Sequence, residues 1–186
     1  MRGFVAVNLP EPLRLEMAAA LAPLVQSSLP VRWLEASAYH LTLKFLGEVA
    51  DAALPAVVDA LTRVAARHAP FTLSLAGAGA FPSRGRPAIF WIGVAAHDRL
   101  AALQHSVEQG IAPLGFPAEP RRFHPHITVG RTRRDAPTGT LRDAASLLDR
   151  ITYDACVEIG TVDLMRSHLS PRGARYECVL AAPLAA

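Results

Sequence analysis

The sequence predicts an α+β fold built from two similar halves. Apolar and polar residues alternate over several short stretches, as in half-buried strands, and between them apolar residues recur at helical spacing. The expected order is strand, helix, strand, strand, helix, strand, and much the same order follows in the second half. One short motif also occurs once in each half. We expect residues 1–186 to form a single domain with two lobes.

The first half begins with an apolar strand and continues with a helix whose first turn accommodates Pro12. Asp51 is placed to cap a second helix. In chain order we expect a strand around residues 4–7, a helix over Glu11–Ser27, extended chain over Trp33–Gly47 that ends in the strand Tyr39–Leu46, a helix from Asp51, and the strand Phe71–Ala80.

The second half opens after a loop that is dense in turn residues, Phe81–Pro87. In chain order we expect the strand Ala88–Val94, a helix over Asp98–Ile111, an irregular segment over Ala112–Arg122, the strand Phe123–Arg131, a short helix over Thr138–Leu148, a long strand over Cys156–His168, the turn Ser170–Gly173 and the strand Tyr176–Leu180.

Positive charge in this chain comes almost entirely from arginine, because Lys44 is the single lysine. The net charge of +3 suits a phosphate-bearing partner, although a GC-rich genome would enrich arginine equally well. The lone lysine excludes two nucleotide-dependent chemistries. No Gly-Lys-Ser/Thr loop is present, and Leu46 stands where a lysyl-nucleotide ligase needs aspartate.

Composition favours a cytoplasmic protein. No apolar run approaches the roughly 20 residues that span a bilayer, and the apolar stretch at the N-terminus is too short for a signal peptide. Cys156 and Cys178 lie in apolar segments, where buried free thiols are favoured, and a disulfide between them stays an alternative. We expect a monomer without a cofactor.

The repeated motif is His-x-Thr-x, found as His40-Leu-Thr-Leu and again, 86 residues later, as His126-Ile-Thr-Val. Because side chains alternate along a strand, His40 and Thr42 share one face, and His126 and Thr128 share one face of the second strand. Strict alternation also puts Lys44 on the His40 face and Phe45 on the apolar face. Two unrelated histidines on solvated strands would be the structural alternative, but two copies at equivalent places favour a shared site.

Two imidazoles suit acid–base chemistry at a phosphate. Histidine titrates near pH 6.5, so at neutral pH one ring can accept a proton while a second ring donates one. In-line displacement at phosphorus needs these two groups on opposite sides of the phosphate. The hydroxyls of Thr42 and Thr128 can donate hydrogen bonds to its oxygens and stabilise the charge that develops.

This chain resembles the two-histidine phosphoesterase superfamily, and within it the RNA 2′,3′-cyclic phosphodiesterases that are also named 2′-5′ RNA ligases. The resemblance covers nearly the whole chain, through the opening strand, the two motifs and a closing hairpin. The quoted segments are Arg2–Val7, Tyr39–Glu48, Phe123–Arg131 and Leu164–Tyr176. It implies two pseudo-symmetric lobes of antiparallel sheet with outer helices, and an active-site groove between the lobes.

The resemblance also implies roles. His40 would donate a proton to the leaving 3′-oxygen, and His126 would accept one from water, which leaves a 2′-phosphate; the residues alone allow either order. Thr42, Thr128 and Arg131 would bind the substrate. The expected partner is RNA with a 2′,3′-cyclic phosphate end, with tRNA fragments as a candidate source, and neither a metal nor a membrane is required. In reverse, the site would join such an end to a 5′-hydroxyl without ATP.

Several alternatives stay open at this point. The substrate could be a small cyclic-phosphate nucleotide, or the protein could bind RNA without turnover. Strict alternation points Arg131 away from His126 unless the strand bends at Gly130. His124, His126 and His40 could form a metal site, which the absence of carboxylates in both motifs disfavours. Further candidates for RNA contacts are Arg84, Arg86, Arg121, Arg122, Arg166, Arg172, Arg175, Trp33 and Tyr39.

Overall fold

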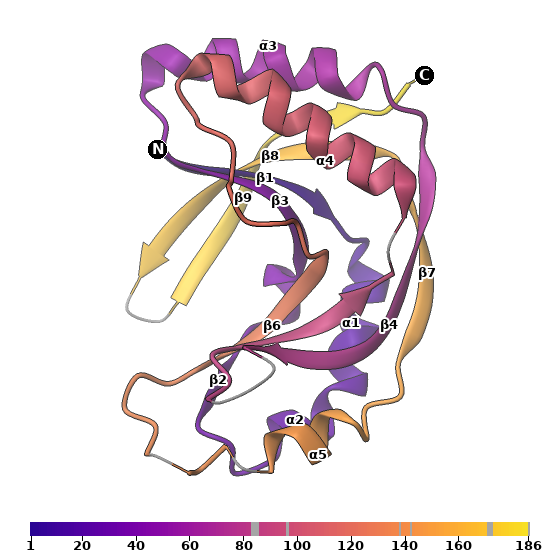
Figure 1. Ribbon diagram of the computed structural model, residues 1–186, viewed down its shortest axis with the longest axis vertical. Helices are drawn as coiled ribbons and strands as arrows, with labels where there is room; N and C mark the ends of the chain where they lie inside the picture. Colours follow the sequence, from indigo (N-terminus) through magenta and orange to yellow (C-terminus); the bar gives the residue numbers. More distant parts are fainter. Residues whose placement is uncertain (83–85, 96, 138, 142, 171–172, 186) are drawn as a thin grey trace.

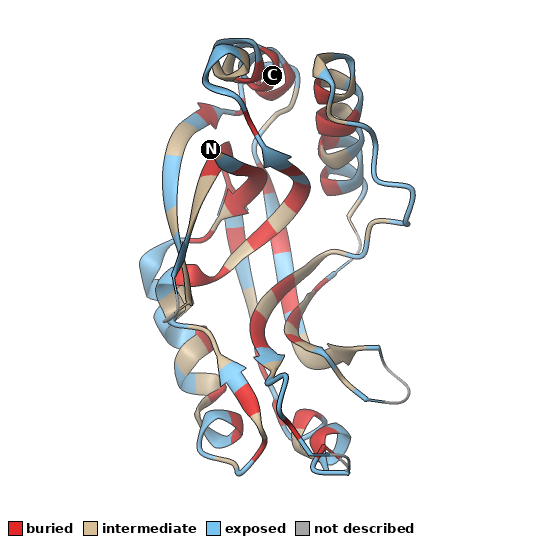
Figure 2. Cartoon of the chain, turned by 90° about the vertical axis from the view of Figure 1, so that its left-hand side faces the viewer, coloured by how far each residue is buried: buried red, intermediate tan, exposed pale blue. Residues whose placement is uncertain are grey.

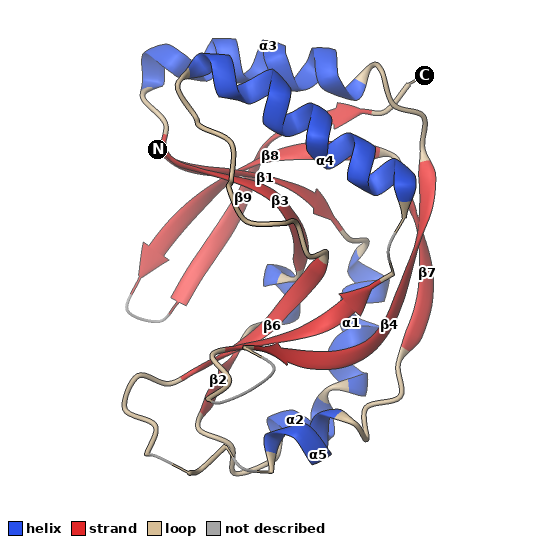
Figure 3. Cartoon of the chain, viewed as in Figure 1, coloured by secondary structure: helices blue, strands red, loops and turns tan. Residues whose placement is uncertain are grey.

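The computed structural model describes residues 1–82, 86–95, 97–137, 139–141, 143–170 and 173–185. Within these residues nine strands form one curled antiparallel sheet (Figures 1 and 3). The order is β7-β4-β5-β6-β3-β1-β8-β9, and β2 also pairs with β6. The strands are β1 (Arg2–Asn8), β2 (Val31–Trp33), β3 (His40–Glu48), β4 (Phe71–Phe81), β5 (Ile89–Val94), β6 (His126–Thr132), β7 (Asp154–Ile159), β8 (Thr161–Ser170) and β9 (Gly173–Pro183).

Helices lie outside the curl of the sheet (Figure 1). In one lobe α3 and α4 pack against each other, α3 contacts β8 and β9, and α4 contacts β3. At the other end of the molecule α5 contacts β4. The helices are α1 (Glu11–Ala20), α2 (Ala22–Val25), α3 (Leu54–Ala65), α4 (Asp98–Ile111) and α5 (Ala144–Leu148), and short 3₁₀ turns cover Ala36–Ala38, Asp51–Ala53 and Ala112–Leu114. The predicted fold, two lobes of antiparallel sheet with outer helices, is confirmed.

The main core lies between the sheet and these helices, and Figure 2 shows the buried stretches of the central strands. The apolar residues of both motifs belong to it, since Leu41 is 1% exposed and Ile127 is fully buried. Burial of these alternate positions fixes which side of each strand faces away from the core. His40 and His126 therefore remain partly accessible on the other side of the sheet, which we call the histidine face.

Two predicted elements are divided in the structure. The helix expected over Glu11–Ser27 breaks at Leu21, because Pro23 lacks the N–H that would continue the hydrogen-bond ladder. The long strand expected over Cys156–His168 is two strands separated by Gly160. β7 pairs with β4 and β8 pairs with β1, so these two strands lie in opposite halves of the sheet.

Three further expectations are corrected. Asp51 does not cap a helix; it begins a 3₁₀ turn, and α3 starts at Leu54 without a side-chain cap. In the region of the expected helix Thr138–Leu148, which includes residues outside the described set, the α-helix covers Ala144–Leu148. Cys156 and Cys178 are free thiols as favoured, but both are exposed rather than buried.

Candidate active site

The two motif strands are neighbours in the middle of the sheet. β3 and β6 pair in antiparallel register through Leu41 and Ile127, both of which point into the core. In the register set by this pair, His40 lies beside Thr128, and Thr42 lies beside His126. The two histidines are thus diagonal neighbours on the histidine face, a relation that puts β-carbons somewhat closer than about 7–8 Å. One phosphate can reach both rings across such a span.

The two imidazoles are held in the same way. His40 Nδ1 lies 2.8 Å from the carbonyl oxygen of Ala38, and His126 Nδ1 lies 2.7 Å from that of His124. A carbonyl oxygen only accepts hydrogen bonds, so each Nδ1 carries a proton and donates a hydrogen bond to the carbonyl of the residue two positions earlier. Each Nε2 is then the atom left for chemistry: it accepts a proton in the neutral ring and donates one in the charged ring.

A β-bulge in β3 changes the alternation that the sequence implies. Opposite β1, Ala6 pairs with Thr42 but Val5 pairs with Lys44, so Leu43 is an extra residue. Beyond the bulge, Lys44 points into the core and Phe45 lies on the histidine face. Lys44 is 3% exposed and Phe45 is 70% exposed, so the predicted faces of these two residues were wrong.

A β-bulge also occurs in β6. Opposite β5, Trp91 pairs with Thr128 and Phe90 pairs with Gly130, so Val129 is the extra residue. Arg131 consequently returns to the histidine face, as the alternative with a bend at Gly130 required. Phe45 and Arg131 occupy equivalent places, five residues after the histidine of each motif. The fifth position after the motif histidine therefore lies on the histidine face in both halves.

Positive charge and burial act together on the histidine rings. The pKa of His40 is lowered to about 4: burial is the main cause, the charges of Arg131 and His126 act in the same direction, and the hydrogen bond to Ala38 partly offsets them. Burial also lowers the pKa of His126, and the charge of Arg131 lowers it as well, whereas the hydrogen bond to His124 raises it. Arg131 thus lies within electrostatic range of both rings. A bound phosphate, which is negative, would counter these effects.

Aromatic rings support each histidine. The His40 ring lies 4.8 Å from the Phe4 ring and 4.9 Å from the Tyr176 ring, between centroids, and Tyr176 meets it edge-on. On the other side of the pair, Phe81 meets His126 edge-on at 5.1 Å. These neighbours leave each ring few alternative orientations. Phe4, Tyr176 and Phe81 were not identified as site residues from the sequence, where only their place in strands or turns was visible.

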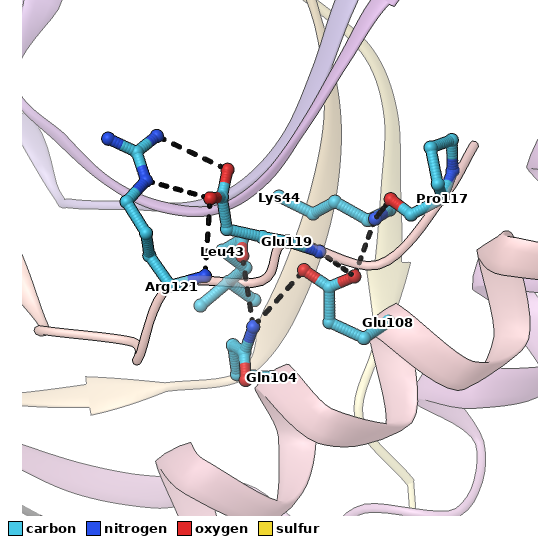
Figure 4. Close-up of polar contacts among 7 residues, drawn as sticks. All are labelled: Leu43, Lys44, Gln104, Glu108, Pro117, Glu119 and Arg121. Carbon is cyan, nitrogen blue, oxygen red and sulfur yellow. Dashed lines mark hydrogen bonds and ion pairs between the residues drawn. The ribbon is translucent and has the colours of Figure 1, made fainter.

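The buried side of β3 is tied to α4 and to the segment before β6 (Figure 4). Lys44 Nζ lies 2.5 Å from a carboxylate oxygen of Glu108 and donates to the carbonyl oxygen of Pro117 at 2.8 Å. Glu108 also accepts from Gln104 and from the backbone N–H of Glu119. The network joins the β3 bulge to the chain that leads into the second motif.

The remaining candidates are distributed as follows. Arg86 donates to the carbonyl oxygen of Ala136, and Arg121 pairs with Glu119. Trp33 packs against Phe90 in the core. Tyr39 is buried, and Arg166 forms an ion pair with Glu177. Arg84 and Arg172 lie outside the described residues. One arginine was missed: Arg32 of β2 is the register partner of Arg131 and is exposed on the same face.

No group of three or more His, Cys, Asp or Glu residues that could hold a metal ion occurs in the described part of the chain. His124, His126 and His40 therefore do not form the metal cluster considered as an alternative. In the same ranges, no helix combines the length and the apolar character that crossing a membrane requires.

A curled antiparallel sheet with outer helices, bearing a His-x-Thr-x strand from each half side by side, defines a two-histidine phosphoesterase. The family model described as the 2′-5′ RNA ligase superfamily matches residues 10–171. The chain belongs to this family. The match covers most of the sequence, so both motifs fall within it.

Relatives and solved structures agree with this assignment. An Archaeoglobus fulgidus protein named RNA 2′,3′-cyclic phosphodiesterase is 34% identical over 95% of this chain and 97% of its own. A Geobacillus stearothermophilus protein of the same name is 44% identical over 56% of this chain, and the match spans 34% of its own length. A crystal structure of a Thermus thermophilus protein has a TM-score of 0.83 at 28% identity, with 99% and 98% of the two chains covered. The structure of E. coli LigT complexed with 3′-AMP has a TM-score of 0.77 at 26% identity, with 98% and 97% covered.

Proposed function

We propose that this protein hydrolyses RNA 2′,3′-cyclic phosphate ends to 2′-phosphomonoesters, with residues 1–186 acting as one two-lobed domain. The observation that carries the proposal is the pair of Nδ1 hydrogen bonds, which leaves the Nε2 atoms of His40 and His126 as matched proton-transfer groups on one face. The names of the Archaeoglobus and Geobacillus relatives supply the substrate class.

In the proposed reaction, water attacks phosphorus from the side of His126, which takes the water proton on Nε2. The bond between phosphorus and the 3′-oxygen breaks, and His40 gives that oxygen a proton. The hydroxyls of Thr42 and Thr128 donate to the non-bridging oxygens. Arg131 balances the growing negative charge on the same face. Acid, base and positive charge all come from side chains, so we propose a reaction that needs no metal.

The same groups would run the reaction with a 5′-hydroxyl in place of water. The 5′-oxygen would bond to phosphorus as the 3′-oxygen leaves, which gives a 2′-5′ linkage without ATP. Hydrolysis of a small cyclic-phosphate nucleotide and RNA binding without turnover are the competing functions. The exposed ring of Phe45 and the arginine pair Arg32 and Arg131, all on the histidine face, favour a polymer with bases and flanking phosphates over a single small nucleotide.

The test uses oligonucleotides that end in a 2′,3′-cyclic phosphate and the corresponding cyclic mononucleotides, each with and without EDTA. We expect conversion of the oligonucleotide end to a 2′-phosphate, unchanged by EDTA. His126→Ala should lose at least about a hundredfold in rate, because general acid–base groups contribute about 10²–10⁴-fold. His105→Ala, an exposed histidine on α4, is the matched control. Loss of activity with EDTA, or full activity of His126→Ala, would contradict the mechanism.

A further inference from the structure

Two exposed arginines lie side by side at one end of the histidine face. Arg32 of β2 and Arg131 of β6 are register partners, so their side chains leave the sheet on the same face, with β-carbons about 4.5–5.5 Å apart. Like charges in directly opposite positions of a sheet repel each other. None of the ion pairs among the described residues includes either arginine. An anionic ligand would relieve this repulsion.

The short strand β2 is fixed against β6, and this fixes the direction of Arg32. A β-carbon at Gly130 of β6 would lie 2.7 Å from the indole ring of Trp33, so the two strands are in close contact. Val31 belongs to the main core and Trp33 packs against it. Because side chains alternate along a strand, Arg32 between them points to the histidine face.

The side chain of Arg32 also contacts the other lobe. A β-carbon at Gly173, the first residue of β9, would lie 2.6 Å from Arg32 Nη2, so the guanidinium covers the place where other residues carry a side chain. In Figure 1, β2 and the hairpin of β8 and β9 come from opposite lobes at the open side of the curled sheet. The guanidinium is thus already held between the lobes, and an ordered side chain loses less conformational entropy when it binds a ligand.

Arg32 lies at about the reach of one nucleotide from the reacting groups. Thr128 lies beside His40, and Arg131, the register partner of Arg32, follows Thr128 by three residues that include the bulge. At about 3.3 Å per residue, this span is no more than about 10 Å. Arg131, but not Arg32, is among the charges that lower the pKa of the two histidine rings. Arg131 therefore faces the reacting phosphate, and Arg32 lies one step further away.

We propose that Arg32 is a second phosphate site, which binds the phosphodiester on the 5′ side of the terminal nucleotide while Arg131 faces the cyclic phosphate. The inference rests on the proposed function, and it defines the preferred substrate as an RNA chain of at least two nucleotides. A guanidinium suits this ligand because its planar set of N–H donors matches two phosphate oxygens. A cyclic mononucleotide with a 5′-hydroxyl has no phosphate for Arg32 to bind.

The first experiment compares adenosine 2′,3′-cyclic phosphate with the 3′-5′-linked dinucleotide ApA that ends in the same cyclic phosphate. Arg32→Gln should lower kcat/KM for the dinucleotide at least about tenfold, the effect expected for a charge-assisted hydrogen bond, and should change that for the mononucleotide less than about twofold. Arg32→Lys keeps the charge without the paired donors, so it should lose only about threefold on the dinucleotide. Arg63→Gln removes an exposed arginine of α3, outside the curl of the sheet, and is the matched control.

The second experiment removes the charge from the RNA instead of the protein. A methylphosphonate in place of the linking phosphate leaves the cyclic end of the dinucleotide intact but makes the flanking group neutral. The wild-type protein should lose at least about fivefold in kcat/KM on this substrate, and Arg32→Gln less than about twofold, because the partner of the missing charge is already absent. Calorimetric titration with ApA 2′-phosphate and its methylphosphonate form should give the same pattern in Kd without turnover.

The outcomes distinguish this second phosphate site from the proposed function. Equal losses of Arg32→Gln on the mononucleotide and the dinucleotide would overturn the second site, and so would equal sensitivity of the wild-type protein and Arg32→Gln to the methylphosphonate. If the wild-type protein leaves cyclic phosphates intact, the proposed function fails, and the calorimetric comparison by itself decides whether Arg32 binds the flanking phosphate.

Discussion

Protonation of His40 should make the folded protein less stable as the pH falls from 7 to 4. In the unfolded chain this imidazole titrates near pH 6.5, whereas burial lowers its pKa in the folded protein to about 4. Between these two values the unfolded chain binds a proton that the folded chain does not, so the stabilisation is complete above pH 6.5 and is lost toward pH 4. A difference of about 2.5 pKa units corresponds to about 3 kcal/mol of unfolding free energy.

Urea unfolding at pH 7, 6, 5 and 4 measures this loss directly. In His40→Asn the side-chain amide can still donate to the Ala38 carbonyl, but it does not titrate. We expect this variant to lose about 3 kcal/mol less than the wild-type protein between pH 7 and pH 4. His105→Asn, on the exposed face of α4, should follow the wild-type curve. Parallel curves for wild type and His40→Asn would refute the reasoning, because the pH dependence would then arise elsewhere.

Four other predictions follow from the site. Thr42→Val keeps the shape but removes a donor to the phosphate, so turnover and phosphate binding should both weaken, by about tenfold or more in kcat/KM; an unchanged value would remove Thr42 from the site. Arg131→Gln should raise the pKa of His40, so that the NMR titration of its ring protons moves to higher pH than in the wild type; an unmoved titration would place Arg131 out of range of the ring. Because a bound phosphate raises the pKa of the acid, the alkaline limb of kcat should lie at higher pH than that of kcat/KM, and coincident limbs would argue against an imidazolium acid. Lys44→Met leaves Glu108 buried without its ion pair and should cost about 3–5 kcal/mol in urea unfolding, most of which Lys44→Met with Glu108→Leu should recover; a double variant as unstable as the single one would contradict the pairing.

The fold and the centre of the candidate site could be predicted from local patterns. Alternation over one strand is a short-range property, so His40 with Thr42, and His126 with Thr128, could be assigned to one face without knowing the neighbouring strands. The helix over Asp98–Ile111 was likewise predicted with its observed bounds. The predicted strand Cys156–His168 was wrong because Gly160 separates two segments whose partners lie far away in the sequence.

The sequence by itself determined that two histidines and two threonines point away from an apolar core, because each strand must bury its alternate side chains. Tertiary structure alone decided on which face of the sheet the residue five positions after each motif histidine lies. Lys44 turns inward because its charge meets Glu108, 64 residues away. Gly130 packs so closely under Trp33 that a β-carbon there would lie 2.7 Å from the indole ring. These long-range contacts accompany the two bulges, and the bulges bring Phe45 and Arg131 to the histidine face.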